Sequence, residues 1–202
     1  MALVLATRSA DKIRELRDLL EGEGRPLVTL DELGIVPTPE EELLESADSF
    51  EGNALAKARF FAAGLDRPVL ADDSGLEVAA LGGRPGVLSK RWSGRSDLSG
   101  KELDRANNSK LISQLAGVRD RRARYVCVAA FCSKNDEVTC RGVTSGLILE
   151  EPRGAGGFAY DPYFWSDELG KTFGEATLEE KQTVSHRARA FRGVLAALDG
   201  RG

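Results

Sequence analysis

Two long strand-like runs, at about 124–133 and 137–149, stand on either side of the short polar joint Lys134-Asn135-Asp136. A short polar joint between two runs rich in Val, Phe and Cys predicts a β-hairpin. Earlier in the chain, shorter apolar runs alternate with stretches of helical periodicity. Strands that alternate with helices and are then followed by an antiparallel hairpin predict a mixed-sheet α/β fold.

The first fifty residues begin this alternation. Residues 2–6 are apolar and predict a buried strand, and a helix that closes at Gly22 and Gly24 follows. A second strand is expected at 27–30. The acidic, Pro-containing stretch 31–46 has weak periodicity and is expected to be a loop. The apolar residues of the first helix are Ile13, Leu16, Leu19 and Leu20.

Capping residues indicate where later helices begin. Asp48 and Glu51 resemble a capping box and predict a helix that runs to Gly64. A full box at 99–102 predicts another helix, which ends at about Gly117. A last helix near the end of the sequence is expected to bury one apolar face. The residues of that face are Ala188, Phe191, Leu195 and Leu198.

The composition excludes several classes of protein. The 202 residues, of which 42% are hydrophobic, suffice for one substantial core or two closely joined lobes. A formal net charge of -4 argues against a protein that mainly coats nucleic acid, whereas a small phosphorylated ligand needs only a local cluster of cations. No run approaches the roughly 20 apolar residues of a membrane span. We therefore expect a cytoplasmic protein that binds neither nucleic acid nor membrane.

The three cysteines, Cys127, Cys132 and Cys140, lie in apolar, strand-like surroundings and have no CxxC spacing. Buried, reduced thiols of a cytosolic protein are the expected state. A zinc site is not expected, because His186 is the only histidine and the cysteine spacing is wrong.

Asp72 and Asp73 follow the apolar run 68–71, which is a predicted buried strand, and precede Ser74-Gly75. Adjacent carboxylates at a strand end can hold a hard cation such as Mg²⁺, which prefers oxygen ligands. The two side chains point in opposite directions in an extended chain, so one could bind the metal while the other orients or deprotonates water. Taken alone, the pair is more typical of an Asx turn that ends the strand.

The segment Thr7-Arg8-Ser9-Ala10-Asp11-Lys12 joins the first strand to the first helix. Backbone amides at a helix N-terminus favour anions, and Thr7, Ser9 and Lys12 could add hydroxyl and ammonium contacts to a phosphate. The glycine spacing of a P-loop is absent. Taken alone, the segment is a plain helix start that Ser9 caps.

Lys181 precedes the triplet Ser185-His186-Arg187. In one continuous helix the side chains of Lys181 and His186 would lie roughly 140° apart and could not easily share a ligand. A new helix capped by Ser185 would instead place His186 and Arg187 in its first turn, where an anion is stabilised. We predict this break, although a His-Arg pair considered alone is more typical of a protein surface.

Three smaller groups are weaker candidates. Glutamates of the acidic stretch could donate a metal carboxylate, polar residues near a helix start could reach a phosphate, and aromatic residues beside glycines could stack on a base. The plainer interpretations are a solvated loop, a polar helix face and loop anchors. The residues are Glu41, Glu42 and Glu45 for the metal, Asn53 and Lys57 for the phosphate, and Phe158 and Tyr160 for the base.

Taken together, these segments resemble the inosine/xanthosine triphosphate pyrophosphatases. The combination of ADDSGL with LGGRPG, GGFAYDP and EEKQTVSHR is highly specific, and the matching stretches stand in the family's order and spacing over nearly the whole chain. They are 3–16, 49–58 (SFEGNALAKA), 71–94, 156–163 and 170–187.

The resemblance implies a long twisted mixed sheet with flanking helices, in one domain (1–202) of two lobes around an active-site cleft, and a homodimer. It also implies Mg²⁺-dependent hydrolysis of a purine nucleoside triphosphate such as ITP, dITP or XTP to the monophosphate and pyrophosphate. Alternatives are a pyrophosphatase for other modified nucleotides and a catalytically weakened nucleotide-binding protein.

The same resemblance assigns roles to residues. Asp73 matches the general base, and Asp72, Asp73 and Glu45 match the metal site. The remaining candidates would contact the triphosphate, the sugar or the base. They are Thr7, Arg8, Ser9, Lys12, Asn53, Lys57, Ser74, Phe158, Ala159, Tyr160, Asp161, Lys181, His186 and Arg187.

One departure from the family pattern concerns the first turn. Ser9 stands where the family usually has Asn, and Asp11 stands where it often has Gly. Ser9 has a shorter reach than Asn, and Asp11 adds a negative charge near the expected phosphates unless it points away. The sequence therefore predicts weaker triphosphate affinity than is usual for the family.

Overall fold

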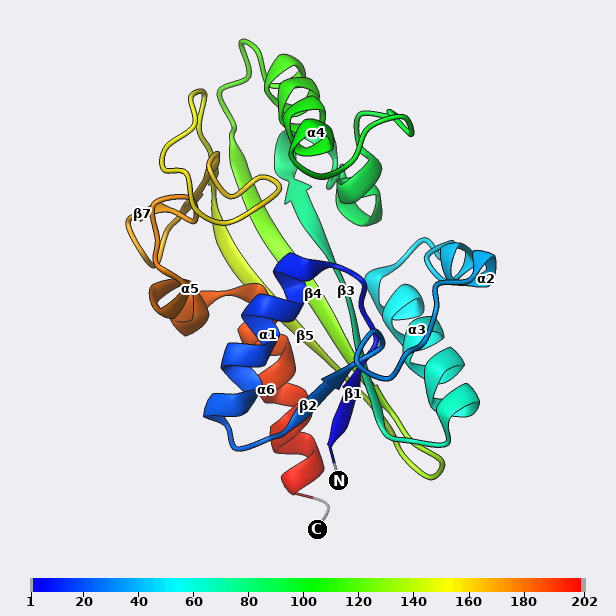
Figure 1. Ribbon diagram of the computed structural model, residues 1–202. Helices are drawn as coiled ribbons and strands as arrows, with labels where there is room; N and C mark the ends of the chain where they lie inside the picture. The colour runs from blue at the N-terminus through cyan, green and yellow to red at the C-terminus, as the bar shows by residue number, and fades with distance from the viewer. Residues whose placement is uncertain (1, 201–202) are drawn as a thin grey trace. The chain divides into compact units, whose positions relative to one another are not determined.

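The computed structural model describes residues 2–200 of the chain, apart from the side chain of Glu42. Within that part, seven strands form one mixed sheet in the order β2-β1-β3-β4-β5-β6-β7 (Figure 1). β1 pairs in parallel with β2 and β3, whereas β6 pairs antiparallel with β5 and β7. The strands are β1 (Leu3–Leu5), β2 (Leu27–Thr29), β3 (Val69–Val78), β4 (Arg122–Cys132), β5 (Glu137–Ile148), β6 (Phe164–Ser166) and β7 (Lys171–Thr172). The mixed-sheet α/β prediction is confirmed.

The helices flank this sheet and alternate with strands in the first half of the chain. Short 3₁₀ turns at Ala79–Leu81 and Gly86–Arg91 follow β3. The helices are α1 (Ala10–Gly22), α2 (Pro39–Leu43), α3 (Phe50–Leu65), α4 (Gly100–Gln114), α5 (Leu178–Val184) and α6 (His186–Asp199). None of the helices in residues 2–200 is long and apolar enough to cross a membrane.

The chain divides into two compact units. The described residues of unit 1 are 2–73, 127–142 and 187–200, and those of unit 2 are 74–126 and 143–186. Strands β3, β4 and β5 therefore contribute residues to both units.

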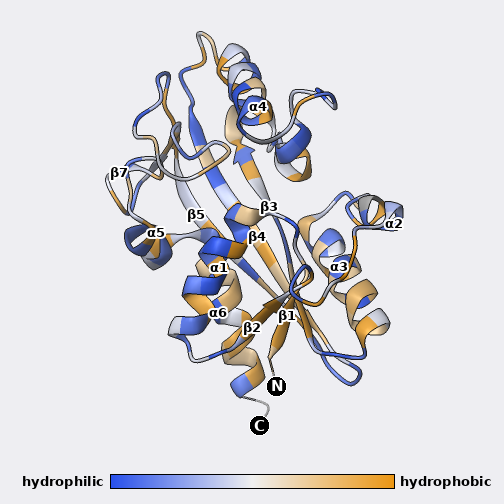
Figure 2. Ribbon diagram, viewed as in Figure 1, coloured by the Kyte–Doolittle hydropathy of each residue, from blue (hydrophilic) through white to orange (hydrophobic). Residues whose placement is uncertain are grey.

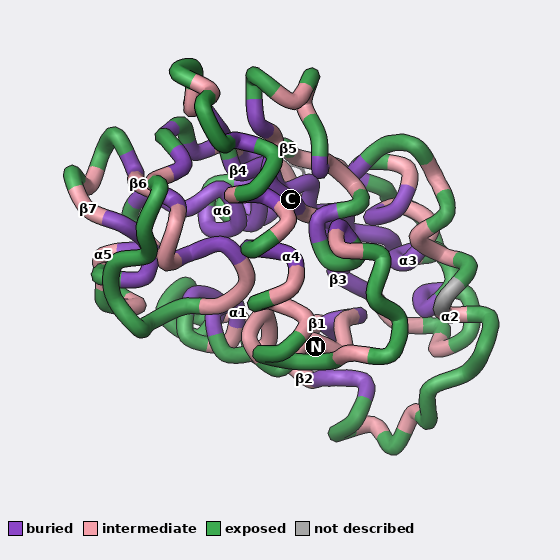
Figure 3. The backbone as a smooth tube through the Cα atoms, turned by 90° about the horizontal axis from the view of Figure 1, so that it is seen from above, coloured by how far each residue is buried: buried purple, intermediate pink, exposed green. Residues whose placement is uncertain are grey.

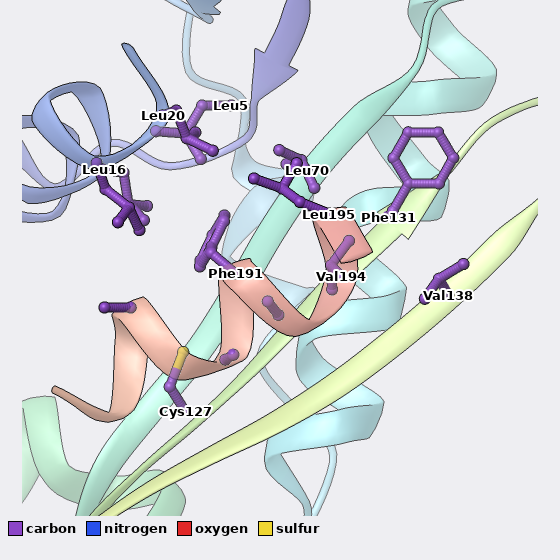
Figure 4. Close-up of a cluster of buried hydrophobic side chains, with 14 residues drawn as sticks. Leu5, Leu16, Leu20, Leu70, Cys127, Phe131, Val138, Phe191, Val194 and Leu195 are labelled. Carbon is purple, nitrogen blue, oxygen red and sulfur yellow. The ribbon is translucent and has the colours of Figure 1, made fainter. Parts of the chain in front are cut away.

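Unit 1 has a core in which α1 and α6 pack on strand residues. Phe191 and Leu195 of α6 lie beside Leu70 of β3, and Leu16 of α1 belongs to the same buried cluster (Figure 4). Figure 2 shows why these elements form: β1 is apolar throughout, whereas α1 carries polar residues beside apolar ones. An amphipathic helix buries its apolar side against such strands.

Unit 2 has its own cluster of buried apolar residues. Leu111 of α4 and Leu115, the residue directly after α4, pack in it with strand residues of β3 and β4 and with Phe164 and Phe173. The ring of Tyr125 in β4 lies 4.6 Å from that of Phe164, measured between centroids. Figure 3 shows β3 and β4 largely buried and the connecting loops largely exposed.

Several sequence predictions are confirmed. β4 and β5 are sheet neighbours joined by four residues, and Ser133 N donates to Asp136 O across the turn at 2.9 Å. Helices α5 and α6 are separate, with Ser185 in an extended conformation between them. The cysteines are free thiols, two of them buried and Cys140 half-buried.

Two predictions about loops and strand ends are wrong. The acidic stretch 31–46 contains helix α2, which begins at Pro39 and whose start is held by a hydrogen bond from Thr38 N to Glu41 Oε1 at 3.3 Å. The strand expected to end at 72–75 continues to Val78, so Asp72 and Asp73 lie inside it. Asp, Ser and Gly favour turns locally, but sheet pairing overrides that preference here.

Two helix caps also differ from expectation. Ser49, not Asp48, is the N-cap of α3, and its Oγ accepts from Gly52 N at 3.1 Å. Ser99 is the N-cap of α4, as predicted, but within the described residues its side chain makes no capping hydrogen bond.

These two serines allow a matched test of capping. Ser49→Ala should lower the free energy of unfolding by about 1 kcal/mol, because Gly52 N–H loses its acceptor. Ser99→Ala is the control, and its effect should stay within about 0.5 kcal/mol. Urea unfolding monitored by circular dichroism measures both, and equal losses would show that the Ser49 cap does not stabilise α3.

Candidate active site

Asp72 and Asp73 lie in the middle of β3 and face opposite sides of the sheet. Leu70, two residues before Asp72, packs with α6, and Asp72 makes its own ion pairs to α1 and α6. Asp73 instead accepts a hydrogen bond from Asn53 of α3. Side chains alternate along a strand, so each face of β3 presents one of the two carboxylates. The opposite orientation predicted from the sequence is correct, although the strand-end location is not.

The Asp72 carboxylate is almost fully buried and surrounded by cations. Its Oδ2 lies 2.9 Å from Lys12 Nζ and 3.5 Å from Arg187 Nε. Burial raises the pKa of Asp72, but the charges of Lys12, Arg187 and Lys57 outweigh burial and hold its pKa well below the ordinary value. Asp72 is therefore charged at neutral pH.

Arg187, the second residue of α6, is held by a second buried anion. Its Nη1 lies 2.5 Å from Oε2 of Glu15 on α1. Burial lowers the pKa of Arg187, but the charges of Glu15 and Asp72 outweigh burial and raise its pKa above the ordinary value. The sequence interpretation missed Glu15. The available signal was a glutamate directly before Leu16, on the face of α1 that carries the buried leucines.

Asp73 has the opposite electrostatics. Its Oδ2 accepts from Asn53 Nδ2 at 2.8 Å, and Asn53 is itself fully buried. Burial raises the pKa of Asp73, and the opposing charges of Lys57 and Lys12 and the Asn53 hydrogen bond do not cancel the rise. A desolvated carboxylate with a raised pKa is more basic than an ordinary aspartate, as a general base requires.

Lys57 of α3 connects the acidic stretch to β3. Its Nζ donates to Glu45 Oε1 at 2.9 Å and to the backbone oxygen of Asp72 at 2.5 Å. Burial lowers the pKa of Lys57, but Glu45, Asp72 and Asp73 together raise it above the ordinary value. Three glutamates of the acidic stretch were proposed for the metal. Glu45 forms an ion pair with Lys57, and Glu41 forms one with Arg8. The side chain of Glu42 lies outside the described part.

The turn between β1 and α1 is a helix start with several internal contacts. Ser9 Oγ accepts from Lys12 N at 3.4 Å, and Thr7 Oγ1 accepts from Ser9 N at 3.2 Å. Asp11 pairs with Arg14 at 3.0 Å, which places its charge beside a cation on the half-exposed side of the helix. The expected repulsion between Asp11 and a phosphate is therefore reduced.

Arg8 from the same turn is engaged elsewhere. Its guanidinium pairs with Glu41 at 2.9 Å and with Asp31 at 2.5 Å, and it donates to Ile35 O. These contacts fasten the segment 31–41 to the first turn. Arg8 would have to exchange an existing carboxylate partner to reach a phosphate.

The candidates for the base lie in unit 2. Asp161 Oδ2 accepts from Lys181 Nζ at 2.6 Å and from Phe158 N at 2.9 Å, and its Oδ1 accepts from Tyr125 OH at 3.2 Å. Lys181 Nζ also lies 5.1 Å from the centroid of the Phe158 ring. Asp161 and Phe158, which are three residues apart, therefore form one polar cluster with Lys181, which lies 20 residues further along the chain.

Three further candidates belong to unit 2. His186 is buried, and its ring stacks on Tyr125 with centroids 4.6 Å apart and an interplanar angle of 8°. Tyr160 is buried, and its hydroxyl donates to Ser89 O at 2.7 Å. Ser74 is half-buried in β3, directly after Asp73. Tyr125 was not predicted, since an aromatic residue in a strand gives no functional signal.

The residues around Asp72 offer an incomplete metal site. Among the described residues, no group of three His, Cys, Asp or Glu side chains is placed to hold a metal ion. However, Asp72 Oδ1 is buried and has no hydrogen-bond partner within residues 2–200. A buried anionic oxygen of this kind fits an oxygen-preferring cation. Glu45 would have to leave or share Lys57 to join it.

Comparison with known proteins places these residues in a family. The model of the Ham1 family matches residues 3–197. The chain belongs to the Ham1 family. Proteins named dITP/XTP pyrophosphatase from Mycobacterium tuberculosis and Thermus thermophilus are 48% and 43% identical to this Ham1 chain. The alignments cover 97% and 98% of this chain and 94% and 91% of those relatives. The resemblance seen in the sequence motifs is confirmed.

Solved structures of Ham1 proteins have the same fold. The Staphylococcus aureus Ham1 protein matches with a TM-score of 0.84 at 33% identity, over 100% of both chains. The nucleoside-triphosphatase, or dITP/XTP pyrophosphatase, of Mycobacterium abscessus matches with a TM-score of 0.70 at 40% identity, over 98% of both chains.

The two aspartates of this Ham1 chain should respond oppositely to removal of charge. Asp72→Asn should destabilise the metal-free protein by about 3 kcal/mol at pH 7, because Lys12 and Arg187 lose a buried counter-charge. Asp73→Asn should stabilise it, because folding there desolvates a carboxylate without full compensation. Unfolding in urea with EDTA measures both.

The pH dependence of these effects follows from the two pKa directions. The folded-state pKa of Asp72 is lowered, so its stabilisation is present above the unfolded pKa of about 3.9 and is lost as pH falls through the lower value. The folded-state pKa of Asp73 is raised, so its destabilisation appears as pH rises through that value. Both differences from the unaltered protein should shrink in acid, and shifts of the same sign at pH 7 would contradict the assignment.

Proposed function

We propose that this protein hydrolyses the non-standard purine nucleoside triphosphates ITP, dITP and XTP to the monophosphate and pyrophosphate. The observation that carries the proposal is the contrast between adjacent aspartates, with Asp72 held as an anion by cations and Asp73 desolvated with a raised pKa. Adjacent carboxylates whose pKa values are shifted in opposite directions are typical of catalytic sites. The names of the curated relatives supply the substrate class.

In the proposed reaction, Asp73 accepts a proton from the attacking water. The water oxygen forms a bond to the α-phosphorus, the bond from that phosphorus to the bridging oxygen of pyrophosphate breaks, and pyrophosphate leaves with the electron pair. Asn53 Nδ2, at 2.8 Å, orients the Asp73 carboxylate. Lys12 and Lys57 stabilise the negative charge that develops on the leaving pyrophosphate.

We further propose Mg²⁺ as the cofactor, with Asp72, Asp73 and Glu45 as its candidate ligands. Because Asp72 and Asp73 face opposite sides of β3, one ion would bind both only after a local shift of the strand. The unpartnered Asp72 Oδ1 supports this choice of ligand. When bound, the metal would offset triphosphate charge and make the attacking water more acidic. Lys57 Nζ lies 2.9 Å from Glu45 and thereby keeps that carboxylate beside the cluster before the metal enters.

The polar cluster of unit 2 is proposed to read the base. Phe158 offers a ring on which a purine can stack, and Lys181 Nζ is a donor beside it that suits the 6-oxo group of hypoxanthine or xanthine. The 6-amino group of adenine would leave that buried donor unpaired, and such a mismatch gives strong discrimination. Asp161 holds Lys181 at 2.6 Å and thereby fixes where the donor lies.

By resemblance to the family, we also propose that the protein acts in the cytoplasm, as a homodimer of one-domain subunits.

A substrate panel tests the reaction and its selectivity. With Mg²⁺ present, dITP, ITP and XTP should release pyrophosphate, whereas ATP, whose 6-amino group does not match the Lys181 donor, should react at least about tenfold more slowly. GTP and dTTP complete the panel. Pyrophosphate and orthophosphate are assayed separately. Release of orthophosphate as the first product, or equal turnover of ATP and ITP, would reject the proposal.

Replacement of the proposed base tests the mechanism. Asp73→Asn should reduce kcat by at least about a hundredfold, because the water loses its proton acceptor. The fold should be intact, and dITP binding, measured by calorimetry, should remain. Asp120→Asn is a matched control, because Asp120 lies in the other unit and pairs with Arg122 at the surface. Near-normal kcat in Asp73→Asn would place the base elsewhere.

A further inference from the structure

One face of α4 holds the backbone of the segment proposed to read the base. Ala159 has a φ of 53°, in the left-handed region that disfavours alanine. Its N–H donates to Asp104 Oδ2 at 3.1 Å, and its carbonyl oxygen accepts from Asn108 Nδ2 at 2.9 Å. Asp104 and Asn108 are four residues apart on α4 and therefore share a face. Two side chains of α4 thus hydrogen-bond both backbone polar groups of Ala159.

The burial of Asn108 indicates that it is retained for its hydrogen bond to the carbonyl oxygen of Ala159. Asn108 is 8% exposed, and its neighbour Leu111 on α4 is fully buried in the apolar cluster of unit 2. Its Oδ1 is buried without a hydrogen-bond partner among the residues that the structure describes. A buried, half-satisfied amide disfavours folding. An apolar side chain would avoid that loss, so stability alone does not explain an asparagine here.

The rest of the segment depends on the conformation of Ala159. Asp161 N donates to Phe158 O at 3.1 Å, and Asp161 Oδ2 accepts from Phe158 N at 2.9 Å, which closes a tight turn around Ala159. Gly157 at φ 68° permits this turn, because a Cβ there would lie 2.1 Å from Asp161 Oδ2. A right-handed Ala159 would break the turn and separate Phe158 from Asp161.

We propose that Asp104 and Asn108 are positioning residues that hold Ala159 in the left-handed conformation and so keep Phe158 and Asp161 ready to bind the purine base. The proposal rests on the proposed function. Without these two hydrogen bonds, the turn populates the binding-competent form for only a fraction of the time. Apparent substrate affinity falls by that fraction, whereas bound substrate still restores the turn and reacts normally.

Steady-state kinetics with dITP test this split. Asp104→Ala and Asn108→Ala should each raise KM about tenfold and leave kcat within about twofold. Asp104→Asn retains an acceptor oxygen for Ala159 N–H, so its KM should stay within about twofold of the unaltered value. When Ala159→Gly is added to Asn108→Ala, KM should fall at least about threefold from its raised value, because glycine adopts positive φ readily.

Asn107→Ala is the matched control. Asn107 is the neighbouring buried amide on α4, but it accepts from Ser93 N at 2.7 Å and donates to Lys90 O at 3.0 Å, so it holds a different segment. Its loss should lower thermal stability and leave KM within about twofold. All assays are run well below the lowest melting temperature of the set.

The outcomes separate the two proposals. Absence of dITP turnover in the unaltered protein rejects the proposed function and this inference together. Normal turnover in the unaltered protein, with KM in Asp104→Ala and Asn108→Ala no higher than in Asn107→Ala, overturns this inference alone. A KM in Asp104→Asn as high as in Asp104→Ala also overturns it.

Discussion

The ion pairs of one buried carboxylate determine how unit 1 is organised. Asp72 Oδ2 in β3 lies 2.9 Å from Lys12 of α1 and 3.5 Å from Arg187 of α6. Burial alone would favour the protonated acid, and the cations reverse that preference. Arg187 is buried as well, and its guanidinium forms a second ion pair, with Glu15 of α1. Because a buried charge without its partner is strongly unfavourable, these contacts hold α1 and α6 to β3 in a way that apolar packing alone would not specify.

The pleat of β3 explains how the next residue can have the opposite chemistry. Asp73 faces α3, where Asn53 Nδ2 donates a hydrogen bond to its Oδ2 at 2.8 Å and burial raises its pKa. Consecutive residues of one strand thereby have lowered and raised pKa values. A proton acceptor next to a carboxylate that is charged at neutral pH would need such a separation, since two adjacent carboxylates on one face would compete for one proton.

Local patterns predicted most of the fold and part of the site. The hairpin and the break before α6 followed from turn residues and helical periodicity, which depend on neighbouring residues. The predicted end of β3 was wrong because the continuation of the strand past Asp73 depends on pairing with strands that are distant in sequence. The roles of the glutamates likewise depend on contacts between distant residues: Glu45 meets Lys57, Glu41 meets Arg8, and Glu15 meets Arg187. No spacing within the sequence encodes those pairings.

In unit 2, the residues proposed to read the base are held in place by hydrogen bonds to one another and to α4. The Asp161 carboxylate accepts from Lys181, Tyr125 and the backbone of Phe158, and both polar backbone groups of Ala159 are bonded to α4. The donor, Lys181, is held by its buried ion pair with Asp161, and Asp161 is itself fixed by its other two hydrogen bonds. Preorganisation of this kind favours the matching base, because little ordering remains to be done on binding. It also penalises the wrong base, because a mismatch at Lys181 cannot be relieved by rearrangement. In the proposed function, a turn held in this way around Ala159 would add selectivity to that which Lys181 alone would give.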